Sequence, residues 1–194
     1  MQDMRPEDVR GEWREYYWNY FDGTSRRLLI TDVETRFPTG ELIVSQTDVA
    51  GIITMCNEAF VHMSGFSREE IMGAPHSILR HPDMPKAAFA DLWTTVDQGK
   101  RWSGYVKNLR RDGGFYWVYA TVIPRIVDGA VVGHTSVRRE PSRDKVEELA
   151  ACVRHDACRG RPGMTRQVRH QPGCQRPQHH RLVHLQHQGA ADDR

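Results

Sequence analysis

The chain has few cysteines and no long apolar run. It contains four cysteines, and only Cys56 lies before residue 150. One cysteine cannot form an internal disulfide framework in that region, which is typical of a reducing compartment. No uninterrupted apolar stretch approaches the length needed to cross a bilayer, and residues 1–10 lack the apolar core of a secretory signal peptide. These absences predict a cytoplasmic protein without a membrane span.

Motifs of common enzyme classes are also absent. The sequence contains no GxSxG nucleophile turn, no phosphate-binding P-loop and no glycine-rich dinucleotide turn after a strand. It shows no paired carboxylates in a recognisable catalytic setting. We therefore predict that the chain is not an enzyme.

Charge is distributed unevenly along the chain. Residues 151–194 hold eight Arg, no Lys and three Asp, a balance of +5. Since the whole chain carries +2, residues 1–150 carry −3. A nucleic-acid function would rest on the tail alone, and none is predicted. The tail also lacks Phe, Trp, Tyr and Ile, so it cannot bury enough apolar surface to offset its chain entropy. We predict that residues 151–194 are disordered.

Residues 1–30 form an aromatic-rich extension. Trp13, Tyr16, Tyr17 and Tyr20 recur with helical spacing. This pattern predicts a short amphipathic docking helix.

Residues 42–139 read as strands at both ends with helices between them. Five runs favour strands, and turn residues separate neighbouring runs at Asp48 to Gly51, Asp112 to Gly114 and Asp128 to Gly129. The predicted strands are 42–47, 52–55, 102–110, 114–126 and 130–138. The predicted helices are 57–63, 67–70 and 85–97, the second with a capping box from Ser67 to Glu70. This order predicts an α+β fold with helices on one face of an antiparallel sheet.

The segment from Arg80 to Pro85, with the sequence RHPDMP, is the most unusual motif. Pro82 and Pro85 fix the backbone on either side of Asp83, and a helix can begin at Pro85. The free N–H groups of a helix entrance attract an anion, and the planar fork of Arg80 suits phosphate. A plainer interpretation makes Asp83 a helix cap and the basic residues solvated surface groups.

This motif also carries a family resemblance. Residues 80–89, together with the sequences WSGYVKN at 102–108 and FYWV at 115–118, closely resemble the sensory PAS domain of bacterial aerotaxis receptors. The resemblance runs from Thr31 to Arg139. It implies a PAS fold with a five-stranded antiparallel sheet, a sensor domain over residues 31–139 and an exit helix or linker over 140–150.

The resemblance further implies a non-covalently bound FAD that reports redox or oxygen state. In the family, the residues that match Arg80, His81 and Asp83 hold the polar half of the dinucleotide. The cofactor-binding residues implied here are Asn57, Arg80, His81, Asp83, Trp102 and Asn108. The two asparagines would face the isoalloxazine ring, and the tryptophan would form a wall of the pocket. From the residues alone, Asn57 is equally a helix cap and Trp102 equally ordinary sheet core.

Two other PAS functions stay open. Haem would need an axial ligand, for which His76 and His81 are the candidates on the helical side. A cofactor-free PAS domain would act as an interaction module that dimerises through its sheet. A blue-light flavin sensor is less consistent, since such domains carry an Asn-Cys-Arg motif where this chain reads His76-Ser77-Ile78-Leu79.

Aerotaxis receptors continue beyond this domain into membrane-spanning and signalling regions. We expect this chain to lack that output region and to carry a frameshifted tail from Ala151. The expected partners are FAD, a signalling region and a second PAS domain. Histidines and cysteines of the tail, such as His180 and His184, invite a metal interpretation, but paired-cysteine loops are missing, so no metal site is predicted.

Overall fold

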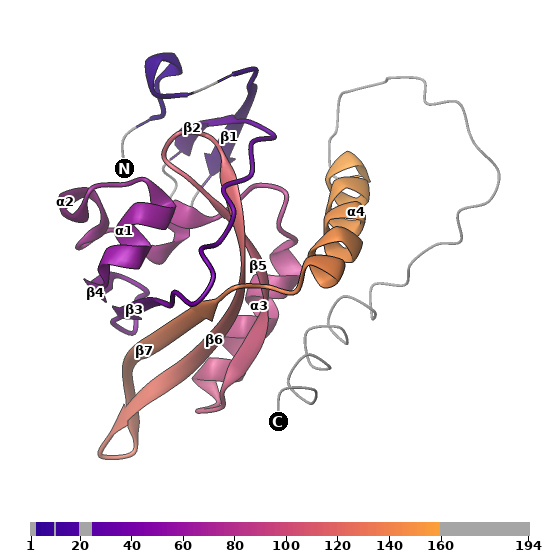
Figure 1. The fold of residues 1–194 in the computed structure, drawn as a ribbon. Coiled ribbons are helices and arrows are strands. Elements are labelled where there is room, and N and C mark those ends of the chain that lie inside the picture. The colour runs from indigo at the N-terminus through magenta and orange to yellow at the C-terminus, as the bar shows by residue number, and fades with distance from the viewer. Residues whose placement is uncertain (1–2, 10, 20–24, 160–194) are drawn as a thin grey trace.

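The computed structural model describes residues 3–9, 11–19 and 25–159, and it has the predicted α+β architecture. Its main sheet is antiparallel, with the strand order β4-β3-β7-β6-β5. Figure 1 shows the helices α1 and α2 on one side of this sheet and α4 on the other. The elements are η1 (Pro6–Asp8), β1 (Arg14–Asn19), β2 (Ser25–Ile30), β3 (Ile43–Thr47), β4 (Ile53–Cys56), α1 (Glu58–Ser64), α2 (Arg68–Ile71), η2 (His76–Leu79), α3 (Lys86–Asp97), β5 (Trp102–Leu109), β6 (Phe115–Val127), β7 (Ala130–Arg139) and α4 (Arg143–Arg159).

Local signals in the sequence set the helix boundaries. Asn57 caps α1, because its side-chain oxygen accepts a hydrogen bond from the backbone N–H of Phe60 at 3.1 Å. Ser67 and Glu70 form the predicted capping box of α2. The hairpin between β3 and β4 is closed by Asp48, whose carboxylate accepts from the N–H of Ile52 at 2.9 Å. All five predicted strands are confirmed to within a residue or two of their ends.

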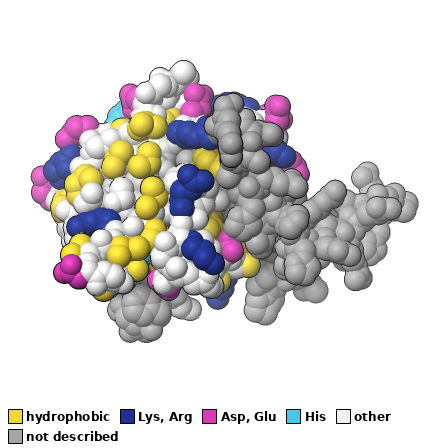
Figure 2. Space-filling view, turned by 90° about the horizontal axis from the view of Figure 1, so that it is seen from below, with side chains coloured by type: hydrophobic (Ala, Val, Ile, Leu, Met, Phe, Trp, Pro, Cys, Tyr) yellow, Lys and Arg dark blue, Asp and Glu magenta, His cyan; other side chains and the backbone are white. Residues whose placement is uncertain are grey.

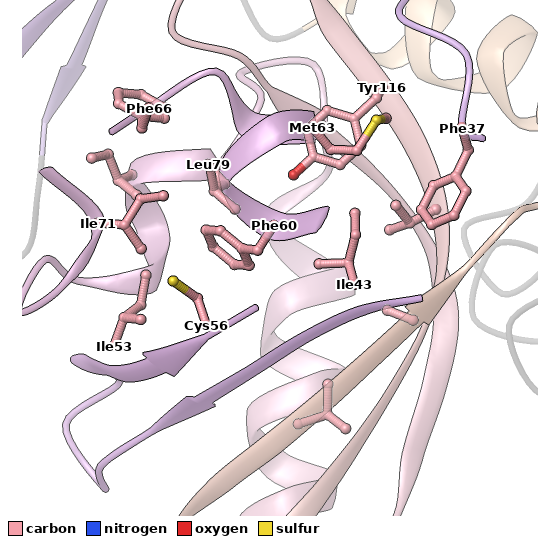
Figure 3. Close-up of a cluster of buried hydrophobic side chains, with 14 of the residues drawn as sticks. Phe37, Ile43, Ile53, Cys56, Phe60, Met63, Phe66, Ile71, Leu79 and Tyr116 are labelled. Atoms are coloured by element: carbon pink, nitrogen blue, oxygen red, sulfur yellow. The ribbon is translucent and has the colours of Figure 1, made fainter. Parts of the chain in front are cut away.

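The main hydrophobic core lies between the sheet and the first three α-helices. Phe60 of α1 is fully buried, and Figure 3 shows its ring close to Cys56 and Leu79. Val118, Ala120 and Val122 of β6 belong to this core. The alternate residues Trp117 and Tyr119 belong to a second cluster, since successive side chains of a strand point to opposite faces.

Helix α4 covers that second face of the sheet. Val146 and Leu149 are buried against Tyr105, Trp117 and Tyr119. The helix runs from Arg143 to Arg159, so the predicted exit helix exists but continues past the predicted boundary at Ala150. The expectation of disorder from Ala151 is thus wrong for residues 151–159, and the rest of the predicted tail, 160–194, lies outside the described residues.

The N-terminal extension forms a hairpin, so the predicted docking helix is wrong. Strand β1 pairs antiparallel with β2, with Arg14 opposite Ile30. Tyr16 and Trp18 are half-buried against a small core, whereas Tyr17 between them is 62% exposed. This alternation has the period of a strand. The spacing of the aromatic residues fits both a helix and a strand, and pairing with β2 selects the strand. Tyr20 lies outside the described residues.

The hairpin is joined to the sheet at the turn between β5 and β6. The N–H of Thr31 donates to the carbonyl of Gly113 at 2.9 Å. Gly113 has φ +82°, and a Cβ there would come within 2.5 Å of the carbonyl oxygen of Leu29. Glycine is therefore required both by the left-handed backbone and by the close approach of the two segments.

Candidate functional site

A cavity of about 120 Å³ lies between the sheet and the segments η2 and α3. Strands β5 and β6 and these two segments supply its apolar wall: Leu79, Phe89, Leu92, Val106, Ala120 and Val122. Strands β3 and β7 supply most of its polar wall: Ser45, Thr47, His134, Ser136 and Arg138. The polar residues occupy alternate positions on each strand, and Ser45 lies opposite Ser136 in the register. The cavity thus has one apolar side and one polar side.

Arg138 is a buried cation in the polar wall. Arg138 is only 2% exposed, and its Nη2 donates to the Ser45 hydroxyl at 3.3 Å. Nη2 also contacts Nε2 of His76, and the guanidinium lies 5.3 Å from the centre of the Phe60 ring. Its Nη1 has no hydrogen-bond partner among the described residues. Burial lowers the pKa of Arg138 from its ordinary value.

Arg80, at the end of η2, is a second cationic residue that lines the cavity. Its guanidinium lies 4.0 Å from the centre of the Phe89 ring and 4.6 Å from that of Trp18. The Trp18 ring comes from the N-terminal hairpin, so this extension contributes directly to the surroundings of a cavity-lining residue. Nε and Nη2 of Arg80 are buried without a hydrogen-bond partner among the described residues. Burial lowers the pKa of this guanidinium too.

The unpartnered polar atoms of the cavity are all nitrogen. Besides the two arginines, they belong to the amide of Asn108 and to Nε2 of His134. No Asp or Glu lines the cavity among the described residues. Guanidinium and amide N–H groups only donate. The cavity is therefore suited to an uncharged or anionic ligand that presents hydrogen-bond acceptors.

The structure brings only part of the predicted cofactor set to this cavity. Arg80 and Asn108 both line it and are joined by a backbone bridge. Asn57 does not line it: its amide N–H donates to the carbonyl of Leu42 at 2.8 Å, and its oxygen accepts from Val44 and Phe60. Trp102 is buried in the sheet core and donates from Nε1 to the Asp91 carboxylate at 2.8 Å.

His81 and Asp83 lie outside the cavity lining and interact with each other and with Lys107. Nζ of Lys107 lies 2.8 Å from the Asp83 carboxylate, and both side chains are largely buried. The backbone N–H of Asp83 donates to Nδ1 of His81 at 3.2 Å. Asp83 does not cap α3, whose first turn has no side-chain cap. These residues hold together the segment 81–85 between Arg80 and α3, which we call the corner.

The pKa values of this group follow from its burial. Burial alone raises the pKa of Asp83, but the neighbouring His81 and the Lys107 ammonium outweigh it and keep that pKa low. Burial, followed by the charge of Lys107, lowers the pKa of His81 to about 3. His81 is thus neutral at pH 7 and Asp83 is ionised.

Of the two candidate haem ligands, only His76 lines the cavity. Burial, followed by the charge of Arg138, lowers its pKa to about 3. Its Nε2 faces the Arg138 guanidinium, so an iron ion at that nitrogen would have to displace a cation. Other metal sites find no support in the part of the chain with described side chains, where no three His, Cys, Asp or Glu residues gather closely enough to hold an ion. The histidines and cysteines after residue 151 lie outside it.

Sequence reasoning missed the polar wall made by β3 and β7. A signal was present, since both strands place polar residues at alternate positions, on the face that carries apolar residues in β6.

Among the described residues, no helix is long and apolar enough to span a membrane.

Comparisons with known proteins agree on the fold. Residues 53–137 match the family model described as PAS fold. The aerotaxis receptor of Escherichia coli (strain K12) is 43% identical over 122 residues, which cover 63% of this chain and 24% of the receptor. The nitrogen fixation regulatory protein of Klebsiella pneumoniae is 29% identical over 90 residues, which cover 46% of this chain and 18% of that protein. This chain therefore spans a quarter or less of the length of these curated relatives.

A solved structure gives the same result. The light-state structure of the blue-light photoreceptor Aureochrome1 LOV matches with a TM-score of 0.51 at 23% sequence identity. The match covers 56% of this chain and 88% of that chain.

Proposed function

Because this chain contains a PAS sensor domain related to that of the aerotaxis receptor, we propose that the domain binds FAD and reports redox or oxygen state. The family match confirms the PAS domain predicted from the sequence. The cofactor, the stimulus and the aerotaxis role belong to the proposal. So does the absence of enzymatic turnover, because a sensor needs a reversible change and no consumed substrate.

The observation that carries the proposal is the excess of unpartnered donors in a cavity without an acid. Arg80, Asn108 and Arg138 offer N–H groups that no described residue accepts. The isoalloxazine ring carries carbonyl oxygens and ring nitrogens along one part of its edge and an apolar dimethylbenzene ring at the other end. The polar and apolar walls of the cavity fit these two ends. A bound flavin supplies reversible redox chemistry, and the chain holds and orients it.

The cavity volume limits how FAD is held. About 120 Å³ is less than the roughly 300–1,000 Å³ of pockets that enclose a whole drug-sized ligand. At this volume the cavity encloses at most part of the isoalloxazine ring, and the phosphates must lie outside. Arg80, at the boundary between the cavity and the N-terminal hairpin, is the residue placed to meet them.

The site could pass its state to a partner through several surfaces. On the face shown in Figure 2, hydrophobic and basic side chains are intermingled. Ile123, Ile126 and Val127 of β6 are about half exposed, beyond the part of the strand that lines the cavity. We propose a signalling region or a second PAS domain as the partner, and a cytoplasmic location.

The first expected result is that the purified protein is yellow. Its absorption spectrum should show the two flavin bands, and heat denaturation should release FAD that chromatography identifies. A haem Soret band, or a folded protein that stays colourless after incubation with FAD, would overturn the proposal.

Arg80→Ala should weaken FAD binding by about ten- to hundredfold. The substitution removes a charge-assisted hydrogen bond to the ligand, worth roughly 1.5–3 kcal/mol. Fluorescence titration of FAD into the cofactor-free protein measures the loss. Arg36→Ala is the matched control, because Arg36 is an exposed arginine away from the cavity. Equal affinities in the two variants would remove Arg80 from the site.

A further inference from the structure

We propose that Arg138 binds the acceptor edge of the flavin ring, with Ser45 and His76 positioning its guanidinium. The inference rests on the proposed flavin function and assigns the ring edge to a residue outside the predicted cofactor set. In this arrangement the two arginines have separate tasks. Arg138 on β7 meets the ring inside the cavity, and Arg80 meets the phosphates at its boundary.

Burying the charge of Arg138 is costly. A charged group taken out of water destabilises a fold unless it is paired and fully hydrogen-bonded. Among the described side chains, the contacts of Arg138 are a hydroxyl, a neutral imidazole and an aromatic ring, without a carboxylate. These partners compensate only part of the charge. A ligand with acceptor atoms in the cavity would supply the remainder.

The two terminal nitrogens of Arg138 differ in their partners. Nη2 of Arg138 is already engaged by Ser45 and His76, whereas Nη1 is buried and unpartnered. Because arginine has no lone pair to offer, Nε2 of His76 must be the acceptor, and its proton sits on Nδ1. His76 and Ser45 thus fix the guanidinium plane from one side. The free side remains for a ligand.

The two cations lie on either side of β6. Arg138 lies on β7, and Arg80 is bridged to Asn108 on β5, with β6 between the two strands. On β6, Ala120 is paired with Arg138 and Val122 with Ser136, and both apolar residues line the cavity floor. A flat ring on this floor can reach Arg138 with one edge while its substituents extend toward Arg80.

The test compares FAD with riboflavin, which has the same ring and lacks the phosphates and the adenosine. Both ligands are titrated into the cofactor-free wild-type protein and the cofactor-free Arg138→Gln variant. For each ligand, the ratio of the wild-type affinity to the variant affinity gives the loss. We expect a loss of about ten- to hundredfold, of similar size for the two ligands, because the lost contact is to the ring. Arg138→Lys should recover part of the affinity. Arg125→Gln, at an exposed arginine on β6, is the matched control and should change neither ratio.

The thermal stability of the cofactor-free protein separates binding from a structural role. Arg138→Met removes a buried, incompletely paired charge, so its melting temperature should equal or exceed that of the wild type. The stabilisation that saturating riboflavin gives the wild type should be lost in this variant. A cofactor-free variant that melts much earlier, with unchanged riboflavin affinity, would make Arg138 a structural residue and overturn the inference.

The remaining outcomes are also decisive. Arg138→Gln with a normal riboflavin affinity and a weakened FAD affinity would place Arg138 at the phosphates and overturn the inference, while the proposed function would stand. Wild-type protein that binds neither flavin would overturn the proposed function and this inference together.

Discussion

Asp83→Ala is expected to lower the free energy of unfolding by about 3–5 kcal/mol, because it strands the Lys107 ammonium in a buried site. Nζ of Lys107 lies 2.8 Å from the Asp83 carboxylate, and Lys107 is 7% exposed. The ring of Phe115, whose centre is 4.1 Å from Nζ, is another neighbour and cannot replace a carboxylate. Urea unfolding of the cofactor-free domain measures the loss.

Two controls accompany this prediction. The double variant Asp83→Ala with Lys107→Met removes both charges and should recover most of the lost stability, because an apolar pair avoids the desolvation cost. Glu148→Ala breaks the exposed pair with Lys145 on α4 and should cost less than about 1 kcal/mol. If Asp83→Ala also costs less than about 1 kcal/mol, the buried pair does not stabilise the corner.

The double variant also decides how Asp83 acts on ligand binding. If Asp83 only holds the corner after Arg80, the restored fold should restore FAD binding. If the Asp83 carboxylate itself contacts FAD, as the family resemblance implies, the double variant should stay ligand-free although it is stable. Either result assigns a role to a predicted site residue that lies outside the cavity lining.

Acidification from pH 7 to pH 4 should lower the stability of the cofactor-free domain by about 3 kcal/mol through His81 alone. Its pKa is about 3 in the folded protein and returns to about 6.5 on unfolding. Between these values the unfolded chain binds the extra proton, so stability rises with pH at about 1.4 kcal/mol per unit. The full contribution is present above pH 6.5 and is lost as the pH falls toward 3. Burial also lowers the pKa of His76 to about 3, so this histidine adds a loss of the same sign.

The free energy of unfolding from urea titrations at pH 7, 5.5 and 4 tests this. His81→Asn keeps a short acceptor near the N–H of Asp83 and cannot be protonated. Between pH 7 and pH 4, the free energy of unfolding of this variant should fall by about 3 kcal/mol less than that of the wild type. His62→Asn, at a histidine that the structure leaves at the surface, is the control and should follow the wild type. Parallel curves for His81→Asn and the wild type would contradict the prediction.

Local signals made most of the fold predictable. The capping box at Ser67 and the turn at Asp48 act within a few residues, so the sequence alone reveals them. The N-terminal hairpin was not predictable in this way. The spacing of Tyr16 and Tyr17 fits a helical face as well as a strand. Only the pairing with β2, which follows residues 20–24 in the sequence, selects the strand.

Some residues of the site were likewise predictable from the sequence, and others were not. Arg80 and Asn108 were found through the resemblance, and the structure brings both to the cavity. Asn57 behaves as the helix cap that its position after a strand also allowed. Arg138 was missed because its significance depends on what surrounds it. An arginine near the end of a strand is usually exposed, and its burial without a carboxylate appears only when η2 and β3 are packed around β7.

Strand β6 has consequences for how this sequence can change over time. Val118, Ala120 and Val122 belong to the core side that carries the cavity, and Trp117 and Tyr119 support α4 on the other. Insertion or deletion of one residue before Val118 would exchange the two sets and place indole and phenol rings where the cavity floor is now. This stretch can therefore drift by point substitution but not by changes in length. Substitutions at alternate positions would retune the cavity and the helix contact independently.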